Sequence, residues 1–228
     1  MAIIATNLQA LRQRVARACK EAQRQPSEVT LLAVGKTFPA SAIREAAEAG
    51  QREFGENYVQ EALAKQDALR DLALTWHFIG PLQSNKTRPI AQAFQWVHSV
   101  EREKIARRLS EARPGDLPAL QVCIEVNVSG EGSKSGVAPE ELASLARQVA
   151  TLPRLSLRGL MAVPEPTTDV ALQRRRFAQL RALKDELVRQ GLALDTLSMG
   201  MSADLEAAIA EGATIVRIGT AIFGERKA

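Results

Sequence analysis

The sequence predicts an α/β protein folded as one (β/α)8 barrel, a single domain spanning residues 1–228. Short apolar runs alternate with helical patterns from one end of the chain to the other. Most of these runs are apolar throughout, which is typical of parallel strands buried on both faces. Eight such units within 228 residues come close to the usual size of a closed barrel. A doubly wound open sheet is the alternative.

The predicted strands are bounded by polar or glycine-containing segments. The first one shows the pattern, because residues 29–34 read Val-Thr-Leu-Leu-Ala-Val, with β-branched side chains at three positions. The strands are expected at residues 29–36, 53–56, 75–79, 95–99, 119–127, 156–163, 194–199 and 214–219.

Helical patterns fill the intervals between the strands, as crossovers between parallel strands require. Little sequence follows the eighth strand. A further pattern at about residues 6–24, with Leu8, Leu11 and Val15 at helical spacing, is expected to cover the gap between the last strand and the first. The other helices are expected at about residues 39–50, 57–71, 85–93, 101–112, 139–151, 168–190 and 203–211.

Composition argues against several classes of protein. No apolar run approaches the ~20 residues of a membrane span, and the N-terminus lacks a signal-peptide pattern, so we expect a cytoplasmic protein with no membrane partner. The net charge is +4, basic residues lie among acids in helical stretches, and aromatic residues are scarce, so nucleic-acid binding is not expected. Cys19 and Cys123 have no partners at metal-ligand spacing, and no metal site is expected.

Lys36 closes the first predicted strand, where a sheet meets the space above it. A low-dielectric wall at such a place depresses the pKa of an amine and frees it to attack a carbonyl. The plainer interpretation is a lysine whose aliphatic stem covers a strand end. Polar or glycine-containing segments also end most of the other predicted strands, and in a barrel these ends share one rim. We therefore expect a site at this rim.

The ends of the seventh and eighth strands offer an anion site. Residues 35–37 resemble the end of a P-loop, but Thr30 stands where the first glycine of that motif belongs. Ser202 is expected to cap the next helix, where its hydroxyl and the free amides favour a phosphate. Gly219 and Thr220 end the adjacent strand, a frequent phosphate position in barrels. A plain helix cap and a tight turn are the alternative.

Arg217 is the one charged residue within the apolar run 214–219. A guanidinium in such a run needs a partner, because burying an unpaired charge is costly. Arg217 shares strand parity with Gly219, so both should face the same side. It is expected either to pair with a barrel carboxylate such as Glu125 or to point at a ligand near Lys36.

Seven segments carry a resemblance to a known family: 33–37 (AVGKT), 54–61 (FGENYVQE), 77–86 (HFIGPLQSNK), 134–136 (KSG), 159–161 (GLM), 198–202 (SMGMS) and 216–224 (VRIGTAIFG). In this order they resemble the pyridoxal-phosphate homeostasis protein family, from about residue 6 to 225. That family is similar to the barrel domain of alanine racemase, a fold-type III pyridoxal-phosphate protein. Gly35 departs from the pattern, since serine is more usual there, and should alter the strand end rather than the chemistry.

The resemblance implies that pyridoxal 5′-phosphate is the cofactor and assigns residues to it. Lys36 would form the Schiff base, and Arg217 would donate to the pyridine nitrogen. His77, Ser84 and Asn85 would lie at the outer rim without an assigned role. The remaining implied contacts are Ser202, Gly219 and Thr220 for the phosphate, Gly200 and Met201 for the shape of the loop, and Asn57 and Met161 for the ring.

The same assignment favours a carrier over an enzyme. A guanidinium keeps its proton at neutral pH, so Arg217 would limit the cofactor as an electron sink. Racemases of this fold use a lysine and a tyrosine from a second domain, whereas the only tyrosine here is Tyr58. We expect a non-catalytic, monomeric protein of vitamin B6 homeostasis, with pyridoxal-phosphate apo-enzymes as recipients. The alternatives are a weak amino-acid racemase and a Schiff-base aldolase for a phosphorylated sugar.

Overall fold

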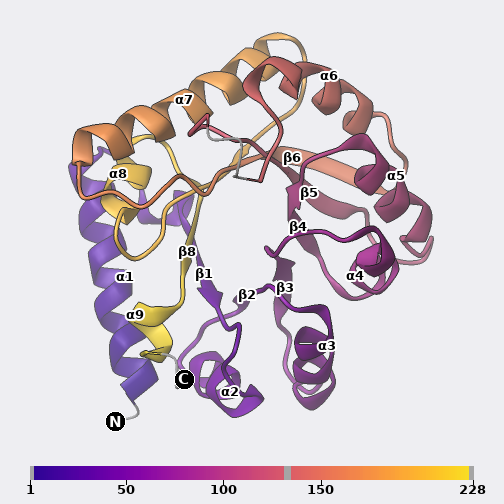
Figure 1. The fold of residues 1–228 in the computed structure, drawn as a ribbon. Helices are drawn as coiled ribbons and strands as arrows, with labels where there is room; N and C mark the ends of the chain where they lie inside the picture. Colours follow the sequence, from indigo (N-terminus) through magenta and orange to yellow (C-terminus); the bar gives the residue numbers. More distant parts are fainter. Residues whose placement is uncertain (1–2, 131–134, 226–228) are drawn as a thin grey trace.

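A computed structural model, which describes residues 3–130 and 135–225, shows a closed barrel of parallel strands ringed by helices (Figure 1). Neighbouring strands follow chain order, and the eighth pairs with the first to close the barrel. This confirms the (β/α)8 prediction over the open sheet. The strands are β1 Thr30–Val34, β2 Glu53–Glu56, β3 Thr75–Phe78, β4 Trp96–Val100, β5 Leu120–Glu125, β6 Leu155–Met161, β7 Thr196–Ser198 and β8 Ile215–Ile218.

The helices lie outside the strands, and their apolar faces form the main core against the sheet. Phe54, Phe78, Phe94 and Phe177 are the largest side chains fully buried there. The helices are α1 Ile3–Glu21, η1 Pro26–Glu28, α2 Ala40–Glu48, α3 Val59–Ala68, η2 Ser84–Lys86, α4 Thr87–Ala93, α5 Glu103–Ala112, α6 Pro139–Ala150, α7 Val170–Arg189, α8 Leu205–Ala210 and α9 Thr220–Phe223.

Helix α1 has the role expected of the extra N-terminal helix. It packs against α8, α9 and α2, and so covers the join between β8 and β1 (Figure 1). Leu8, Leu11 and Val15 are buried at the spacing that the sequence shows. Asn7 extends the contact by donating from its side chain to the carbonyl of Ile222, at 2.9 Å.

Some boundaries differ from those predicted. The helix expected at 85–93 begins as the 3-10 turn η2, because the Thr87 hydroxyl donates to the carbonyl of Ser84 and tightens this entry. Strand β1 stops at Val34, since the chain turns at Thr37, whose φ is +68°. The short helix α9 was not expected after the eighth strand.

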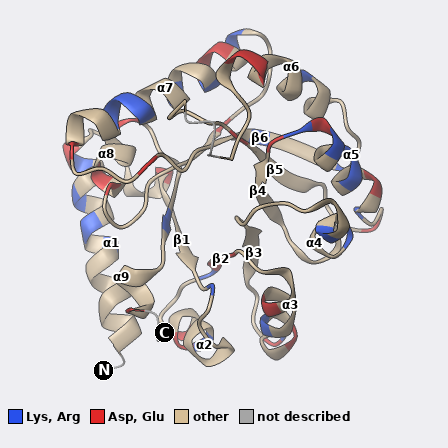
Figure 2. Ribbon diagram, in the orientation of Figure 1, with Lys and Arg blue, Asp and Glu red and all other residues tan. Residues whose placement is uncertain are grey.

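Basic and acidic residues are interspersed over the outer helices, as the charge pattern of the sequence indicates (Figure 2). Several pair with one another, including Arg14 with Glu206 at 2.5 Å and Arg44 with Asp71 at 2.7 Å. Within residues 3–130 and 135–225, no helix has the length and hydropathy needed to cross a membrane.

Candidate functional site at the carboxyl ends of the strands

A cavity of about 370 Å³ lies at the carboxyl ends of the barrel strands. It brings together most of the residues that the sequence assigns to a site, although these come from four separate stretches of chain. Its other walls are apolar, and the sequence had not singled them out. The lining residues are Val34, Lys36, Asn57, Ile79, Val163, Met201, Ser202, Ala203, Arg217, Gly219 and Thr220.

The backbone on both sides of Lys36 is held by hydrogen bonds. The amide of Gly35 donates to the carbonyl of Gly55 on the neighbouring strand, at 3.0 Å. The amide of Thr37 donates to Glu61 at 2.6 Å, and the carbonyl of Gly35 accepts from the ammonium of Lys65 at 2.7 Å. Because the turn is fixed on either side, Lys36 is presented from a defined point on the rim.

Lys65 belongs to a buried cluster that sequence reasoning missed. Its ammonium donates to Glu56 Oε1 at 2.7 Å and to Glu61 Oε1 at 2.6 Å. Burial raises the pKa of Glu56 to about 7, against the opposing pull of Lys65 and a smaller one of Lys36. In the described part of the chain, Glu56 Oε2 has no hydrogen-bond partner. The pKa of Glu56 therefore lies near neutral pH.

Gly35 allows this cluster to lie close to the strand end. A Cβ added at Gly35 would lie 2.9 Å from Glu56 Oε1 and 2.5 Å from Ile43 Cδ1. The serine that is more usual here would therefore need the end of the Ile43 side chain to move, and would bring a hydroxyl to Glu56. The departure at Gly35 thus changes the support of the turn and leaves Lys36 in place.

Arg217 is buried on β8 and reaches the floor of the cavity. Its Nη1 donates to the Ser198 carbonyl at 2.6 Å and to Ser198 Oγ at 2.7 Å, and its Nη2 donates to the Ala162 carbonyl at 2.8 Å. Burial lowers the pKa of Arg217 to about 10, while Glu125 acts to raise it. The guanidinium stays charged at neutral pH, and direct hydrogen bonds to Ser198 and Ala162 hold it, with Glu125 contributing through the electrostatic field.

The prediction that Ser202 caps a helix is wrong. Helix α8 begins at Leu205 with Asp204 at its N-cap position. The Asp204 carboxylate accepts from the amide of Met201 at 2.6 Å, so the turn before the helix is closed by Asp204. Ser202 instead lines the cavity together with Gly219 and Thr220, which follow the neighbouring strand β8. Gly219 lets β8 approach β1, since a Cβ there would lie 3.2 Å from the Val34 carbonyl oxygen.

Of the remaining predicted residues, some line the cavity and others do not. Asn57 lines the cavity, and within the described residues its buried Oδ1 has no hydrogen-bond partner. Met161 and Gly200 are buried and are not among the lining residues. Gly200 has a φ of +94°, which suits the loop-shaping role expected of it. His77 was expected at the outer rim, but it is buried within β3, so that prediction is wrong.

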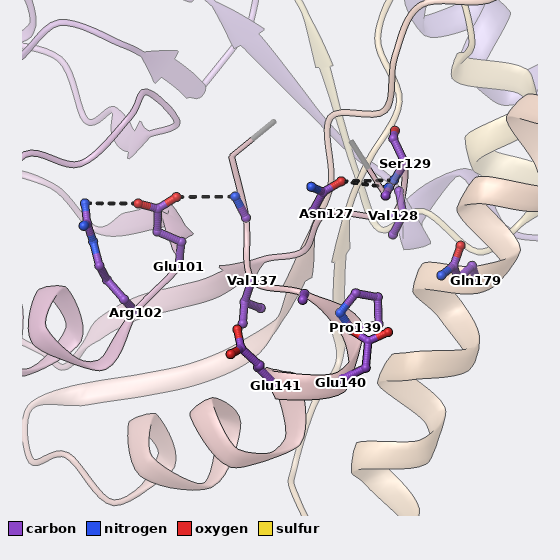
Figure 3. Close-up of a pocket in the computed structure, with 13 residues that line it drawn as sticks. Glu101, Arg102, Asn127, Val128, Ser129, Val137, Pro139, Glu140, Glu141 and Gln179 are labelled. Atoms are coloured by element: carbon purple, nitrogen blue, oxygen red, sulfur yellow. Dashed lines mark hydrogen bonds and ion pairs between the residues drawn. The ribbon is translucent and has the colours of Figure 1, made fainter. Parts of the chain in front are cut away.

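A larger cavity, of about 730 Å³, lies between the end of β5 and the start of α6 (Figure 3). Glu101 accepts there from the amide of Gly136 at 3.3 Å and pairs with Arg102 at 3.1 Å. Asn127 Oδ1 accepts from the amides of Ser129 and Gly130. This wall adjoins residues 131–134, and Lys134 of the KSG segment lies outside the described residues.

The fold and the cavity around Lys36 define a (β/α)8 barrel with an amine, a guanidinium and hydroxyls at one mouth. The model of the alanine racemase N-terminal domain family matches residues 6–227. The pyridoxal phosphate homeostasis protein of Pseudomonas aeruginosa is 64% identical over 226 residues, 99% of this chain and 97% of that protein. That of Escherichia coli K12 is 53% identical, over 98% of this chain and 97% of its own. The chain belongs to the pyridoxal phosphate homeostasis protein family, as the resemblance predicted.

Solved structures agree with this assignment. PipY of Synechococcus elongatus, determined with PLP bound, is 44% identical with a TM-score of 0.85, covering 97% of this chain and 100% of PipY. Alanine racemase of Corynebacterium glutamicum has a TM-score of 0.74 at 18% identity, covering 98% of this chain and 61% of the racemase. The second likeness is one of fold alone.

Proposed function

We propose that this chain binds pyridoxal 5′-phosphate in the cavity around Lys36 and takes part in the homeostasis of this cofactor, without catalysing an amino-acid reaction. The observation that carries the proposal is the meeting of Lys36, Arg217, Ser202 and Thr220 around one cavity. The relatives named as pyridoxal phosphate homeostasis proteins, and PipY with PLP bound, support the choice of ligand.

The residues present fit this cofactor. Ser202 and Thr220 offer hydroxyls for a phosphate, and Gly219 leaves room for close approach of the backbone. Arg217 is a fixed cationic donor for a ring nitrogen, and Asn57 Oδ1 is an acceptor that lacks a partner within the described chain. The volume of about 370 Å³ falls in the usual range for small-molecule sites. Bound there, the cofactor would supply an aldehyde that the amine of Lys36 can hold as a Schiff base.

The same residues favour holding the cofactor over turning a substrate over. Among the described residues that line the cavity, Lys36 and Arg217 are the only titratable side chains. Arg217 keeps its charge and so withholds a proton from a ring nitrogen. Tyr58 is 54% exposed and is not among the lining residues. A second base for a two-base racemization is therefore missing from this described lining.

We also propose a location, an oligomeric state and a class of partner for the chain. We place it in the cytoplasm as a single-domain monomer, with pyridoxal-phosphate apo-enzymes as recipients. The closed barrel supports the monomer, because it leaves no sheet edge for pairing with a second copy. The rim position of the cavity supports transfer, because the ligand would enter and leave at one mouth. Sedimentation of the loaded chain, alone and with an apo-enzyme, tests both statements.

Spectroscopic titration with pyridoxal 5′-phosphate tests the ligand. The intact chain should gain a visible absorbance band at stoichiometric cofactor, and Lys36→Ala should lose it. Lys104→Ala, which removes an exposed lysine of α5, is the matched control and should titrate like the intact chain. Absence of the band would favour the aldolase alternative. Rapid exchange of amino-acid α-protons into deuterated water would instead support an enzyme and overturn the carrier proposal.

A further inference from the structure

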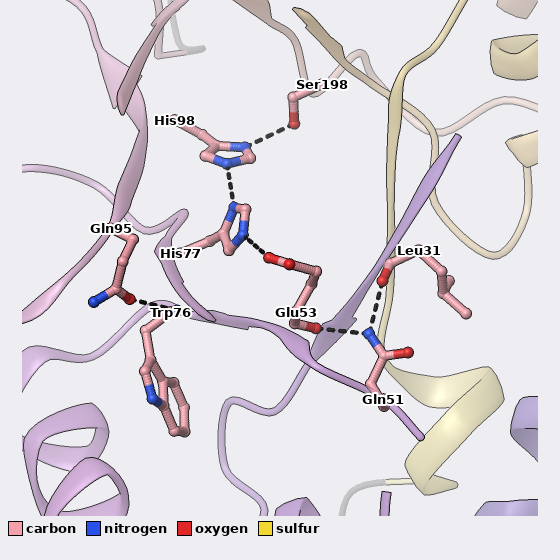
Figure 4. A network of polar contacts seen from close by, with 8 residues as sticks. All are labelled: Leu31, Gln51, Glu53, Trp76, His77, Gln95, His98 and Ser198. Carbon is pink, nitrogen blue, oxygen red and sulfur yellow. Dashed lines mark hydrogen bonds and ion pairs between the residues drawn. The ribbon is translucent and has the colours of Figure 1, made fainter. Parts of the chain in front are cut away.

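A line of polar side chains runs through the interior of the barrel from Glu53 to Ser198 (Figure 4). Ser198 joins this line to Arg217. Glu53 Oε2 lies 2.7 Å from His77 Nε2, and His77 Nδ1 lies 2.9 Å from His98 Nε2. His98 Nδ1 in turn lies 2.8 Å from Ser198 Oγ, which accepts from Arg217 at 2.7 Å. The interior of such a barrel is usually filled by layers of branched apolar side chains, so this line is a departure from the pattern.

The line spans the barrel from one end to the other. Strands β4 and β7 are not neighbours in the barrel, so the contact between His98 and Ser198 must cross its interior. Glu53 is the first residue of β2, at the amino end, and its side chain is 32% exposed. Arg217 lines the cavity at the carboxyl end. Solvent at the amino end is therefore connected to the cavity floor through hydrogen-bonded side chains.

The chemistry of the two ends sets the direction of these bonds. Arg217 can only donate, so Ser198 Oγ accepts from it, and the hydroxyl proton of Ser198 is available for His98 Nδ1. His98 then carries its proton on Nε2 and donates to His77 Nδ1, and His77 donates from Nε2 to the carboxylate of Glu53. The reverse order would require a protonated carboxyl on the partly exposed Glu53 and would leave the Ser198 proton without an acceptor along the line.

Both rings are neutral in this arrangement. Burial lowers the pKa of His77, although Glu53 opposes the effect. Burial also lowers the pKa of His98 well below its ordinary value, and the nearby charge of Arg217 acts in the same direction. His77 is further fixed from the side, since its ring stacks on Trp96 at 5.4 Å with the planes 5° apart. Arg158 lies over the same indole, 5.2 Å from its centre.

We infer that Glu53, His77, His98 and Ser198 are positioning residues for Arg217, and that they act as one directional hydrogen-bond chain with both imidazoles protonated on Nε2. The chain joins a carboxylate at the amino end to the guanidinium at the cavity floor and holds that guanidinium in one orientation. The inference rests on the proposed function insofar as Arg217 receives the ring of the bound cofactor.

The tautomers are measurable in the chain without cofactor. The sequence contains two histidines, so every imidazole signal in a nitrogen-15 NMR spectrum belongs to this line. Near neutral pH, both rings should show a protonated Nε2 and a bare Nδ1. A proton on Nδ1 of either ring, or an imidazolium, would overturn the inference. The NMR measurement needs no cofactor, so its outcome does not depend on whether the chain binds pyridoxal 5′-phosphate.

A matched pair of variants tests the positioning role. Ser198→Ala removes the link between His98 and Arg217, so the dissociation constant for pyridoxal 5′-phosphate should rise about tenfold, and the His98 nitrogen signals should move. Ser110→Ala removes an equally buried hydroxyl that donates to the carbonyl of Pro153 on the outer layer, and should change neither. Equal affinities in the two variants would contradict the inference. Should Ser198→Ala fail to fold, the tautomers of the intact chain decide.

Discussion

Lys65 and Glu56 form an ion pair of 2.7 Å against the turn that presents Lys36, and their side chains are only 5% and 0% exposed. A buried ion pair of this kind adds little stability over an apolar pair. Removal of one partner is destabilising, however, because the other charge is left buried and unpaired. The pair also ties α3 to the end of β1, because Lys65 donates to the carbonyl of Gly35. The support of Lys36 therefore depends on a side chain outside the cavity.

Lys65→Met should destabilise the chain by about 3 kcal/mol, because Glu56 would be left buried without its cation. Chemical denaturation monitored by circular dichroism measures the change. The double variant Lys65→Met/Glu56→Gln should recover at least half of the loss, since the remaining unpaired carboxylate, Glu61, has a side chain that is 29% exposed. If the double variant were as unstable as the single one, the charge of Glu56 would not be the cause.

The contribution of Glu125 to the stability of the folded chain should fall as the pH rises. Burial raises its pKa from 4.5 to about 7, and Glu101 adds to the rise. The folded chain therefore binds this proton more tightly than the unfolded chain, and the share of stability due to Glu125 falls as the pH rises from 4.5 to about 7. Near pH 4.5, the free energy of unfolding of Glu125→Gln should match that of the intact chain. At about pH 7 and above, it should be larger by about 2–3 kcal/mol.

Unfolding free energies of the two proteins across this range check the prediction. Parallel pH profiles for Glu125→Gln and the intact chain would show that Glu125 does not titrate with the raised pKa.

Gly35 offers a comparison between two small substitutions. Gly35→Ala should cost about 1–2 kcal/mol, because the new methyl group crowds Ile43 Cδ1. Gly35→Ser should cost less, because its hydroxyl can donate to Glu56, whose Oε2 lacks a partner within the described chain. Thermal unfolding of both variants distinguishes them. Equal losses would mean that the serine hydroxyl does not reach the carboxyl group.

The phosphate assignment is tested by comparing two ligands. Ser202→Ala and Thr220→Val each remove a hydroxyl from the cavity wall, and each should weaken binding of pyridoxal 5′-phosphate by about tenfold. Binding of pyridoxal, which lacks the phosphate, should stay the same. Equal weakening for both ligands, measured by absorbance titration, would place these hydroxyls elsewhere on the cofactor.

The sequence predicted the barrel well, because continuous apolar runs and helical spacing depend on local patterns that burial preserves. It also pointed to Lys36 and Arg217 as candidate site residues, because each is a charged residue within or next to an apolar strand, and both line the cavity. It could not find the line from Glu53 to Ser198, because these residues lie far apart in the sequence and β4 meets β7 only across the barrel interior.

Two errors have local causes. Ser202 was predicted to cap α8, but the helix begins two residues later than this requires. Asp204 stands at the N-cap position, and its carboxylate accepts from the amide of Met201. Lys65 stands four residues after Glu61, which in a sequence is typical of an exposed helix pair. The fold buries Lys65, however, and places its ammonium beside Glu56 and the carbonyl of Gly35.

Borohydride reduction in the presence of pyridoxal 5′-phosphate, followed by peptide mass spectrometry, tests the role of Lys36 most directly. Reduction fixes the cofactor to the amine that holds it, and we predict that the peptide carrying Lys36 is modified at stoichiometric cofactor. Lys36→Ala should show no such modification there or elsewhere. Stoichiometric labelling of another lysine, or no labelling of the intact chain, would contradict the account.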